Sequence, residues 1–195
     1  MSKKTFQAVF DKAQRAGVSI NDTRASMKWL EQNITNMKVS QKSVLEDKTR
    51  ARSKITVGRM YMFVYDAKTK DKLPYWDKFP LVFPFAPAPG GFYGINLHYL
   101  PPYLRAKLFD ALMHHTQGDM INEATKLRIS YDILKSASTN KYFAPCVKRY
   151  LNSHVRSQFI NIQPSEWMVA LFLPTEKFQG ASKQQVWKDS KARTR

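Results

Sequence analysis

The chain has 195 residues, of which 43% are hydrophobic and 13% aromatic, so it can bury a sizeable core and is not typical of a disordered protein. Its 32 Lys and Arg against 15 Asp and Glu give a net charge of +17, which predicts a polyanionic partner such as nucleic acid, or neutralising neighbours in a large assembly. The single cysteine excludes an intrachain disulfide, and the sequence shows neither a secretory signal nor an apolar run of roughly 18 residues. We therefore expect a soluble protein of the cell or virion interior without a membrane partner.

Residues 1–56 predict a basic helical arm. They carry twelve Lys and Arg against five Asp and Glu, but only three of the 25 aromatic residues. The apolar residues of a first helix recur at helical spacing: Phe6, Val9, Phe10 and Ala13. Gly17 can end this helix, Asp22 can cap a second, and Ser40 or Ser43 can begin a third that continues through residue 54. We expect the arm to pack on the rest of the chain, on a partner, or on itself as a hairpin.

Residues 58–100 predict a small antiparallel sheet or half-barrel. Three apolar and aromatic runs, within "RMYMFVYDA", "FPLVFPF" and "GFYGINLHYL", are separated by turn signals such as the charged "DAKTKD". Because proline has no N–H to donate to a ladder, Pro80 and Pro84 predict that the second run is an edge strand or is broken by a bulge.

The glycines of "APAPGGFYGINL" could belong to a phosphate-binding loop or to a tight turn. A P-loop needs Lys and a hydroxyl residue after its last glycine, whereas Ile95 and Asn96 follow Gly94. A dinucleotide-binding loop needs a helix after the glycines, whereas "INLHYL" has the pattern of a strand. The prolines and the Gly90-Gly91 pair are typical of a reversing turn, so we predict strand, turn, strand.

From residue 101 onward the apolar spacing becomes helical. We predict one helix after Pro101 and Pro102, a second from Asn122 to about residue 137, and a third over 142–155. A short apolar helix with Pro164 in its first turn follows, and the basic tail could form a final exposed helix. The predicted class is α+β, with an arm at 1–56, a core at 57–173 (β-module about 58–100, helices about 101–173) and a tail at 174–195.

Two groups of residues are candidates for contacts with DNA phosphates. The first forms a ridge opposite the apolar stripe of the predicted helix over 142–155, with no acid between its ends: Lys141, Lys148, Arg149, Asn152 and Arg156. An ordinary solvated helix face is the alternative. The second is a basic run that could be a flexible anchor: Lys48, Arg50, Arg52, Lys54 and Arg59.

Aromatic side chains of the β-module could stack on bases if they are exposed. The candidates are Tyr61, Tyr65, Tyr75, Trp76, Phe92, Tyr93 and Tyr99. We expect most of them to fill the core instead, because so small a sheet has few other residues to bury.

The sequence contains no recognisable catalytic or metal-binding pattern. His114 and His115 are adjacent, unlike the i, i+4 spacing of a helical zinc site. Cys146 lies in an apolar stripe, which predicts a buried free thiol rather than a nucleophile. Acidic residues are too scarce for a metal-dependent nuclease. We therefore expect no enzyme activity, no metal and no cofactor.

Three parts of the chain resemble a family of virion proteins from tailed bacteriophages, the T-even-like myophages and their cyanophage relatives. They are the string that begins "GRMYMFVYDAKTKDKLPYWDKFPLVFPF", the string "YFAPCVKRYLNSHVRSQF" and the string "EWMVALFLPTEKF", together covering roughly residues 58–190. The resemblance is to DNA end-protector proteins. It implies a minor virion protein in or near the head–tail junction that binds the end of the packaged genome and has no enzyme activity.

The sequence thus predicts a non-enzymatic phage protein that binds double-stranded DNA, at a genome end, through Lys and Arg contacts to phosphates. Other virion proteins would be its neighbours, in the host cytoplasm during assembly and then in the virion, where it could be oligomeric. The alternative is a structural neck, tail or baseplate component that docks on other subunits, with its basicity secondary.

Overall fold

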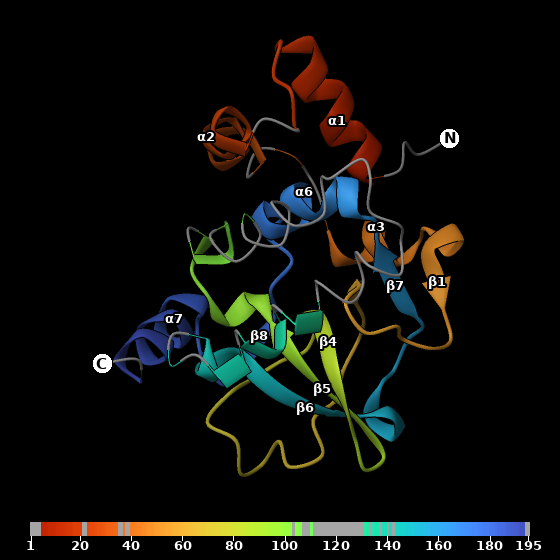
Figure 1. The fold of residues 1–195 in the computed structure, drawn as a ribbon, viewed down its shortest axis with the longest axis vertical. Coiled ribbons are helices and arrows are strands. Elements are labelled where there is room, and N and C mark those ends of the chain that lie inside the picture. Colours follow the sequence, from red (N-terminus) through yellow and green to blue (C-terminus); the bar gives the residue numbers. More distant parts are fainter. Residues whose placement is uncertain are drawn as a thin grey trace.

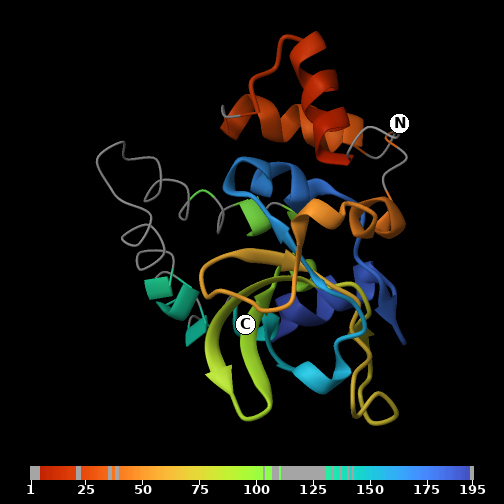
Figure 2. The same cartoon turned by 90° about the vertical axis from the view of Figure 1, so that its right-hand side faces the viewer.

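The computed structural model describes residues 5–20, 23–34, 37, 40–102, 104–106, 110, 131–132, 134–136, 138–139, 141 and 143–193 (Figures 1 and 2). The helices are α1 (Thr5–Arg15), α2 (Thr23–Asn33), α3 (Gln41–Leu45), α6 (Trp167–Phe172) and α7 (Lys183–Ala192). Single 3₁₀ turns are η2 (Lys48–Arg50), η3 (Leu97–Tyr99), η4 (Ala144–Cys146), η5 (Asn152–His154) and η6 (Pro164–Glu166). Most of the helices predicted over 101–137, and the predicted caps Asp22 and Asn122, lie outside the described residues.

The fold is built on an antiparallel sheet of six strands in the order β1-β7-β2-β4-β5-β6. These strands are β1 (Ala51–Arg52), β2 (Met60–Met62), β4 (Leu81–Ala88), β5 (Gly91–Asn96), β6 (Val147–Leu151) and β7 (Phe159–Ile162). A separate pair is formed by β3 (Trp76–Asp77) and β8 (Phe178–Gln179). The predicted α+β class, with an antiparallel sheet and N-terminal helices, is confirmed.

The glycine-rich stretch is a hairpin, as predicted. β4 and β5 pair across a turn in which Gly90 has φ +70°, a left-handed conformation that favours glycine. A Cβ on Gly91 would lie 1.8 Å from the carbonyl oxygen of Tyr150, so glycine lets β5 and β6 approach closely. β4 lies inside the sheet rather than at its edge, and the predicted bulge is present as a register shift between Pro84 and Ala86.

One face of the curled sheet encloses an aromatic cluster. Beyond β2 the chain bends across to the segment between β6 and β7, where Tyr65 and Val155 form a β-bridge and the N–H of Asp66 donates to the carbonyl of His154 at 3.0 Å. The enclosed rings pack mainly edge to face, and Phe63 contacts Phe92, Tyr150 and Phe159 at centroid distances of 5.1–6.1 Å. The aromatic excess of the β-module is therefore largely core.

The other face of the sheet is covered by helices. α6 lies between the sheet and the α1–α2 pair (Figures 1 and 2), and one buried apolar cluster runs from Phe6 in α1 to Val186 in α7. Ser40 caps α3 together with Ser43, and α1 ends just before Gly17, whose φ is +69°, as the sequence predicted. Residues of the predicted arm thus share a core with the sheet.

Two of the predicted helices are wrong. The segment predicted as a helix over 142–155 forms η4, β6 and η5, because Val147 to Leu151 pair with β5. Its apolar residues fit a helical stripe, but Val and Tyr also favour strands, and the exposed backbone of β5 supplies the partner. The third N-terminal helix ends at Leu45, and the chain continues as η2 and then as β1 beside β7. The short helix after Pro164 and the helix of the tail are present, the latter with Val186 buried.

Candidate nucleic-acid interface

A buried carboxylate, Asp77 in β3, joins three segments that are distant in sequence. It accepts hydrogen bonds from the backbone N–H groups of Phe79 (3.0 Å) and Lys177 (3.2 Å) and from the amide of Asn96 (3.1 Å), and it lies 2.8 Å from Nδ1 of His98. All five residues belong to strings that resemble phage end-protector proteins. The network fixes the chain around β3 against η3 and β8, which positions one wall of a cavity.

A second network positions α7 at the same place. The indole N–H of Trp187 donates to the carbonyl of His98 at 2.8 Å, and the guanidinium of Arg105 lies 5.5 Å from a ring of the same tryptophan. Arg105 is fully buried and donates to the carbonyl oxygen of Leu171 at 2.9 Å. α7 is therefore held against η3, with Arg193 at its C-terminal end.

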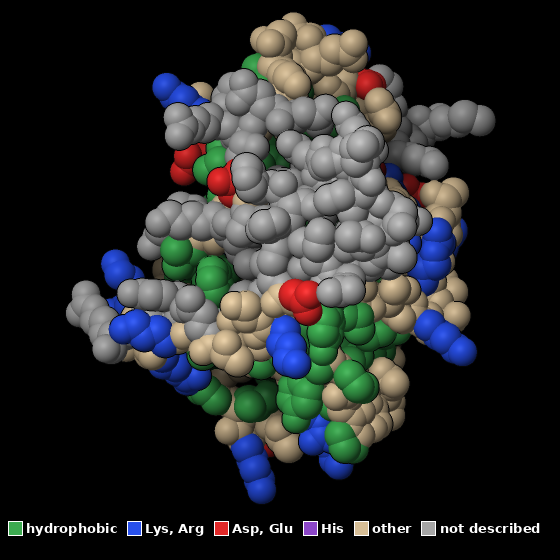
Figure 3. Space-filling model, in the orientation of Figure 1, with side chains coloured by type: hydrophobic (Ala, Val, Ile, Leu, Met, Phe, Trp, Pro, Cys, Tyr) green, Lys and Arg blue, Asp and Glu red, His purple; other side chains and the backbone are tan. Residues whose placement is uncertain are grey.

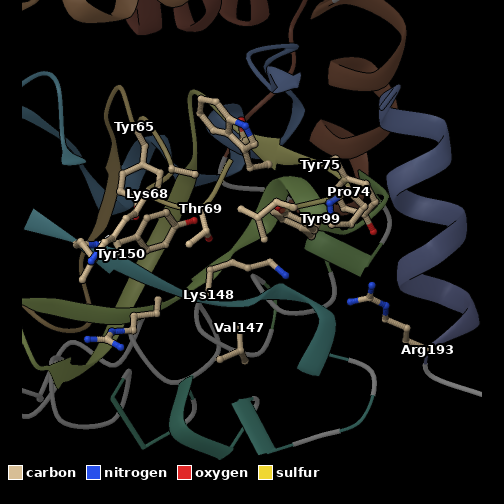
Figure 4. A pocket seen from close by; sticks show the side chains of 16 residues that line it. Tyr65, Lys68, Thr69, Pro74, Tyr75, Tyr99, Val147, Lys148, Tyr150 and Arg193 are labelled. Carbon is tan, nitrogen blue, oxygen red and sulfur yellow. Dashed lines mark hydrogen bonds between the residues drawn. The ribbon is translucent and has the colours of Figure 1, made fainter. Parts of the chain in front are cut away.

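The cavity has a volume of about 610 Å³ and lies between residues 65–77, η3, β6 and the end of α7 (Figure 4). This is the size of a site for one small molecule or one nucleotide. Its lining combines aromatic rings with Lys and Arg. The lining residues that matter here are Tyr65, Lys68, Thr69, Tyr75, Trp76, Tyr99, Lys148, Arg149, Tyr150 and Arg193.

Lys148 is the unusual group of this lining. Its ammonium lies 4.1 Å from the centroid of the Tyr99 ring, a cation–π contact, and Figure 4 shows it extending from β6 towards that ring, with Arg193 on the far side. Burial, aided by the positive charge of Arg193, lowers the pKa of Lys148 to about 8. Among the described residues, no carboxylate or carbonyl oxygen makes an ion pair or hydrogen bond with this ammonium.

The segments around the cavity are more basic than the chain as a whole. Residues 65–78, 147–156 and 183–193 carry eleven Lys and Arg against four Asp and no Glu. Figure 3 shows Lys and Arg side chains over α7 and at the lower end of the molecule, with fewer acidic side chains beside them. Such an arrangement favours a polyanion at the mouth of the cavity.

Comparison with known families decides the identity of the chain. The sequence profile described as phage T4 terminal DNA protecting protein matches residues 2–192. The chain belongs to this family. The match extends the resemblance seen in the sequence to the N-terminal helices, which the quoted strings did not include. No curated protein and no solved structure matches the chain.

Membership of the terminal DNA protecting family establishes a bacteriophage protein of the DNA end-protecting kind, with DNA as a partner. A protein of this kind is not expected to be an enzyme. No helix in the part of the chain that the structure describes is long and apolar enough to cross a membrane.

The structure separates the residues of the predicted ridge. Lys148 and Arg149 both line the cavity from β6, and the guanidinium of Arg149 donates to the carbonyl of Pro89 at 2.7 Å. Asn152 and Arg156 are exposed beyond the end of β6, in and after η5.

Lys141, the remaining ridge residue, is exposed just before η4. The premise of a single helix face does not hold for the five ridge residues. Two lie on β6 and one in η5, and the other two lie before η4 and after η5.

The second predicted basic run lies around η2 and β1, on the opposite side of the molecule from α7 (Figure 1). Arg50 is only 14% exposed and forms a bidentate ion pair with Glu166, and its Nε lies 2.8 Å from a carboxylate oxygen of Asp47. Its guanidinium is thus engaged within the fold. The other members are exposed or half-buried at the surface: Lys48, Arg52, Lys54 and Arg59.

The aromatic candidates fall into two groups. Tyr61 and Phe92 are buried in the aromatic cluster, and Tyr93 is 37% exposed beside the ring of Phe85. Four candidates line the cavity, of which the first and last are buried and the other two are half-buried: Tyr65, Tyr75, Trp76 and Tyr99.

Catalytic and metal chemistry find no support among the described residues. No group of three or more His, Cys, Asp or Glu is placed to hold a metal ion within the described ranges. Thr175 lies 3.5 Å from Nε2 of His98, which contacts Asp77, but all three side chains are buried away from solvent. Cys146 is a buried free thiol, as predicted, and burial raises its pKa to about 12.

Sequence reasoning missed Lys68, Thr69 and Arg193 as members of one site. They belong to a charged turn and a basic tail that are more than 100 residues apart, so no spacing pattern connects them. A weak signal was present, because both segments are basic and both lie in or beside strings that resemble the phage family.

Proposed function

We propose that this protein binds the end of linear double-stranded DNA without catalysis, through Lys and Arg contacts to phosphates made by the basic surface around the cavity. The observation that carries the proposal is the excess of eleven Lys and Arg over four Asp in the three segments that surround an aromatic cavity, in a member of the terminal DNA protecting family. Cations at the mouth attract the backbone, and the cavity offers a place for a strand end.

The genome end inside the virion, near the head–tail junction, is the location that this activity suggests. Other virion proteins would contact surfaces away from the cavity, such as the α1–α2 pair, which Figure 1 shows at the far end of the molecule from β5 and β6. A bound protein that covers the strand end would exclude an exonuclease without any chemistry of its own.

The test is a competition assay at moderate salt. Labelled linear duplex is challenged with equal masses of unlabelled linear and covalently closed circular DNA, and resistance of the labelled end to exonuclease is measured in parallel. We expect linear DNA to compete much better and the end to resist digestion. Equal competition would leave generic DNA affinity only, and no binding to either would favour the structural virion component.

A matched pair of triple variants locates the surface. Replacing Lys148, Arg149 and Arg193 with Gln should weaken the salt dependence of DNA affinity. The slope of log affinity against log salt concentration should fall by about three, since each lost phosphate contact removes about one. The control replaces three cations around η2 and β1 with Gln: Lys48, Arg52 and Lys54. It removes the same charge on the opposite side, so an equal effect would contradict the assignment to the cavity surface.

A further inference from the structure

We propose that the cavity receives one terminal nucleotide, unpaired from the duplex, with its phosphate against Lys148 and Arg193 and its base among the aromatic side chains. This inference rests on the proposed function and names the part of the DNA that the site recognises. The geometry points to it through the lysine, the size of the cavity and the composition of its walls.

Lys148 is a partly buried cation for which the described part of the chain supplies no anion. Arg105, which is fully buried, donates to the carbonyls of Leu100 and Leu171 and lies 4.0 Å from a carboxylate oxygen of Glu176. Arg50 has two carboxylate partners. The ammonium of Lys148 has only the Tyr99 ring among the described residues. An uncompensated cation in a partly buried site is costly, and a bound phosphate supplies the missing charge.

The charged groups that face Lys148 agree with an anionic ligand. Arg193 points into the same cavity from the end of α7, and Figure 4 shows the two cationic groups approaching from different elements. Asp77, an acid of the lining, is already engaged by the hydrogen bonds of its network. The phosphate site would therefore have two cations and no competing free carboxylate within the described lining.

The walls suit a base and a sugar. Tyr and Trp rings are platforms on which proteins stack single-stranded bases. Tyr75 and Trp76 line the cavity and are only half-buried, so a planar ligand could reach them. Lys68 and Thr69 are exposed at the mouth and can hold the next phosphate.

The size of the cavity explains a preference for ends. About 610 Å³ is the size of a site for one small ligand, whereas an internal base pair stays stacked between its neighbours, so a nucleotide must leave the stack before it enters. Unstacking is least costly where a base is mismatched or already single-stranded, and a terminal pair has a neighbour on one side only. Phosphate contacts alone do not distinguish an end from internal DNA.

The test compares two DNA forms of the same stem sequence: a hairpin with one free end and a dumbbell closed by loops at both ends. We expect wild-type protein to bind the hairpin about tenfold more tightly, and more tightly still when the terminal pair is mismatched. 2-Aminopurine at the terminal position should change its fluorescence on binding, whereas the same base six pairs inward should not.

Lys148→Gln should reduce the hairpin-to-dumbbell ratio to about one while leaving dumbbell affinity within about twofold. Arg193→Gln, at an exposed position where unfolding is not a concern, should reduce the same ratio, and Lys148→Arg should retain it. Arg52→Gln is the control and should leave the ratio unchanged. Thermal midpoints of all variants are measured to establish that they are folded.

An unchanged ratio in both Lys148→Gln and Arg193→Gln would overturn the inference while leaving end binding intact. An equal loss of hairpin and dumbbell affinity would also overturn it, because these residues would then be general phosphate contacts. If the wild-type protein itself fails to distinguish linear from circular DNA, the proposed function fails, which is a separate result.

Discussion

The ion pair between Arg50 in η2 and Glu166 in η6 links the N-terminal residues to the segment that follows β7. Substituting Arg50 measures how much this link contributes to stability. Both side chains are largely buried, with exposed fractions of 14% and 9%, and Glu166 also accepts a hydrogen bond from the N–H of Gln163 at 3.0 Å. The guanidinium lies over the Phe6 ring at 5.0 Å. Arg50→Ala removes the partner and leaves a buried carboxylate uncompensated.

The expected cost is about 3 kcal/mol of unfolding free energy, at the low end of the range for breaking a buried pair, because neither group is fully buried. For a chain of this length that corresponds to a fall of roughly 6–12 °C in the thermal midpoint. Arg52→Ala is the matched control. Arg52 is exposed and, within the described ranges, donates only to the carbonyls of Thr49 and Ala51. Its loss should therefore change stability by less than about 0.5 kcal/mol.

Urea unfolding followed by tryptophan fluorescence measures both variants and a double-mutant cycle with Glu166→Gln. The coupling energy between positions 50 and 166 should be on the order of 1–3 kcal/mol. DNA affinity of the folded Arg50→Ala protein should equal that of wild type. Equal stability of Arg50→Ala and Arg52→Ala would refute the reasoning, and so would additive effects at positions 50 and 166.

Three further predictions concern other parts of the molecule. Gly91→Ala should destabilise the protein by about 1–3 kcal/mol in thermal unfolding, because the new Cβ collides with the Tyr150 carbonyl. Gly90→Asn should cost much less, since Asn tolerates the positive φ of this position. Equal losses of stability in the two variants would contradict the collision at Gly91. Cys146 should not react with a maleimide at pH 8 until the protein is unfolded, because it is buried with a raised pKa, and rapid labelling of the native protein would contradict its burial. The pKa of Lys148 is lower in the folded state than in the unfolded chain, so the unfolded state binds more protons between pH 8 and 10.5. The free energy of unfolding should therefore rise with pH in the lower part of this window, by on the order of 1 kcal/mol. Lys148→Met should abolish this rise in urea titrations, and an equal rise in the variant would exclude Lys148 as its source.

Much of the fold and of the functional class could be predicted from the sequence, because those features are encoded locally. The spacing of Phe6, Val9 and Phe10 indicated α1, and the glycines with their flanking prolines indicated the β4–β5 hairpin. Pro84 indicated a bulge or an edge strand, and the bulge is present. The charge of +17 indicated a polyanionic partner, and the quoted strings indicated the phage end-protecting family to which the chain belongs.

What the sequence could not determine depends on which segments become neighbours. Val147 to Leu151 fit either a helix or a strand, and only pairing with β5 decided for the strand. Arg50 and Lys148 look alike as basic residues in a basic chain, but the fold gives the first a carboxylate from position 166 and leaves the second facing an aromatic ring. Charge is a property of composition, whereas the availability of a charge depends on tertiary contacts, and that is why the cavity became visible only in the structure.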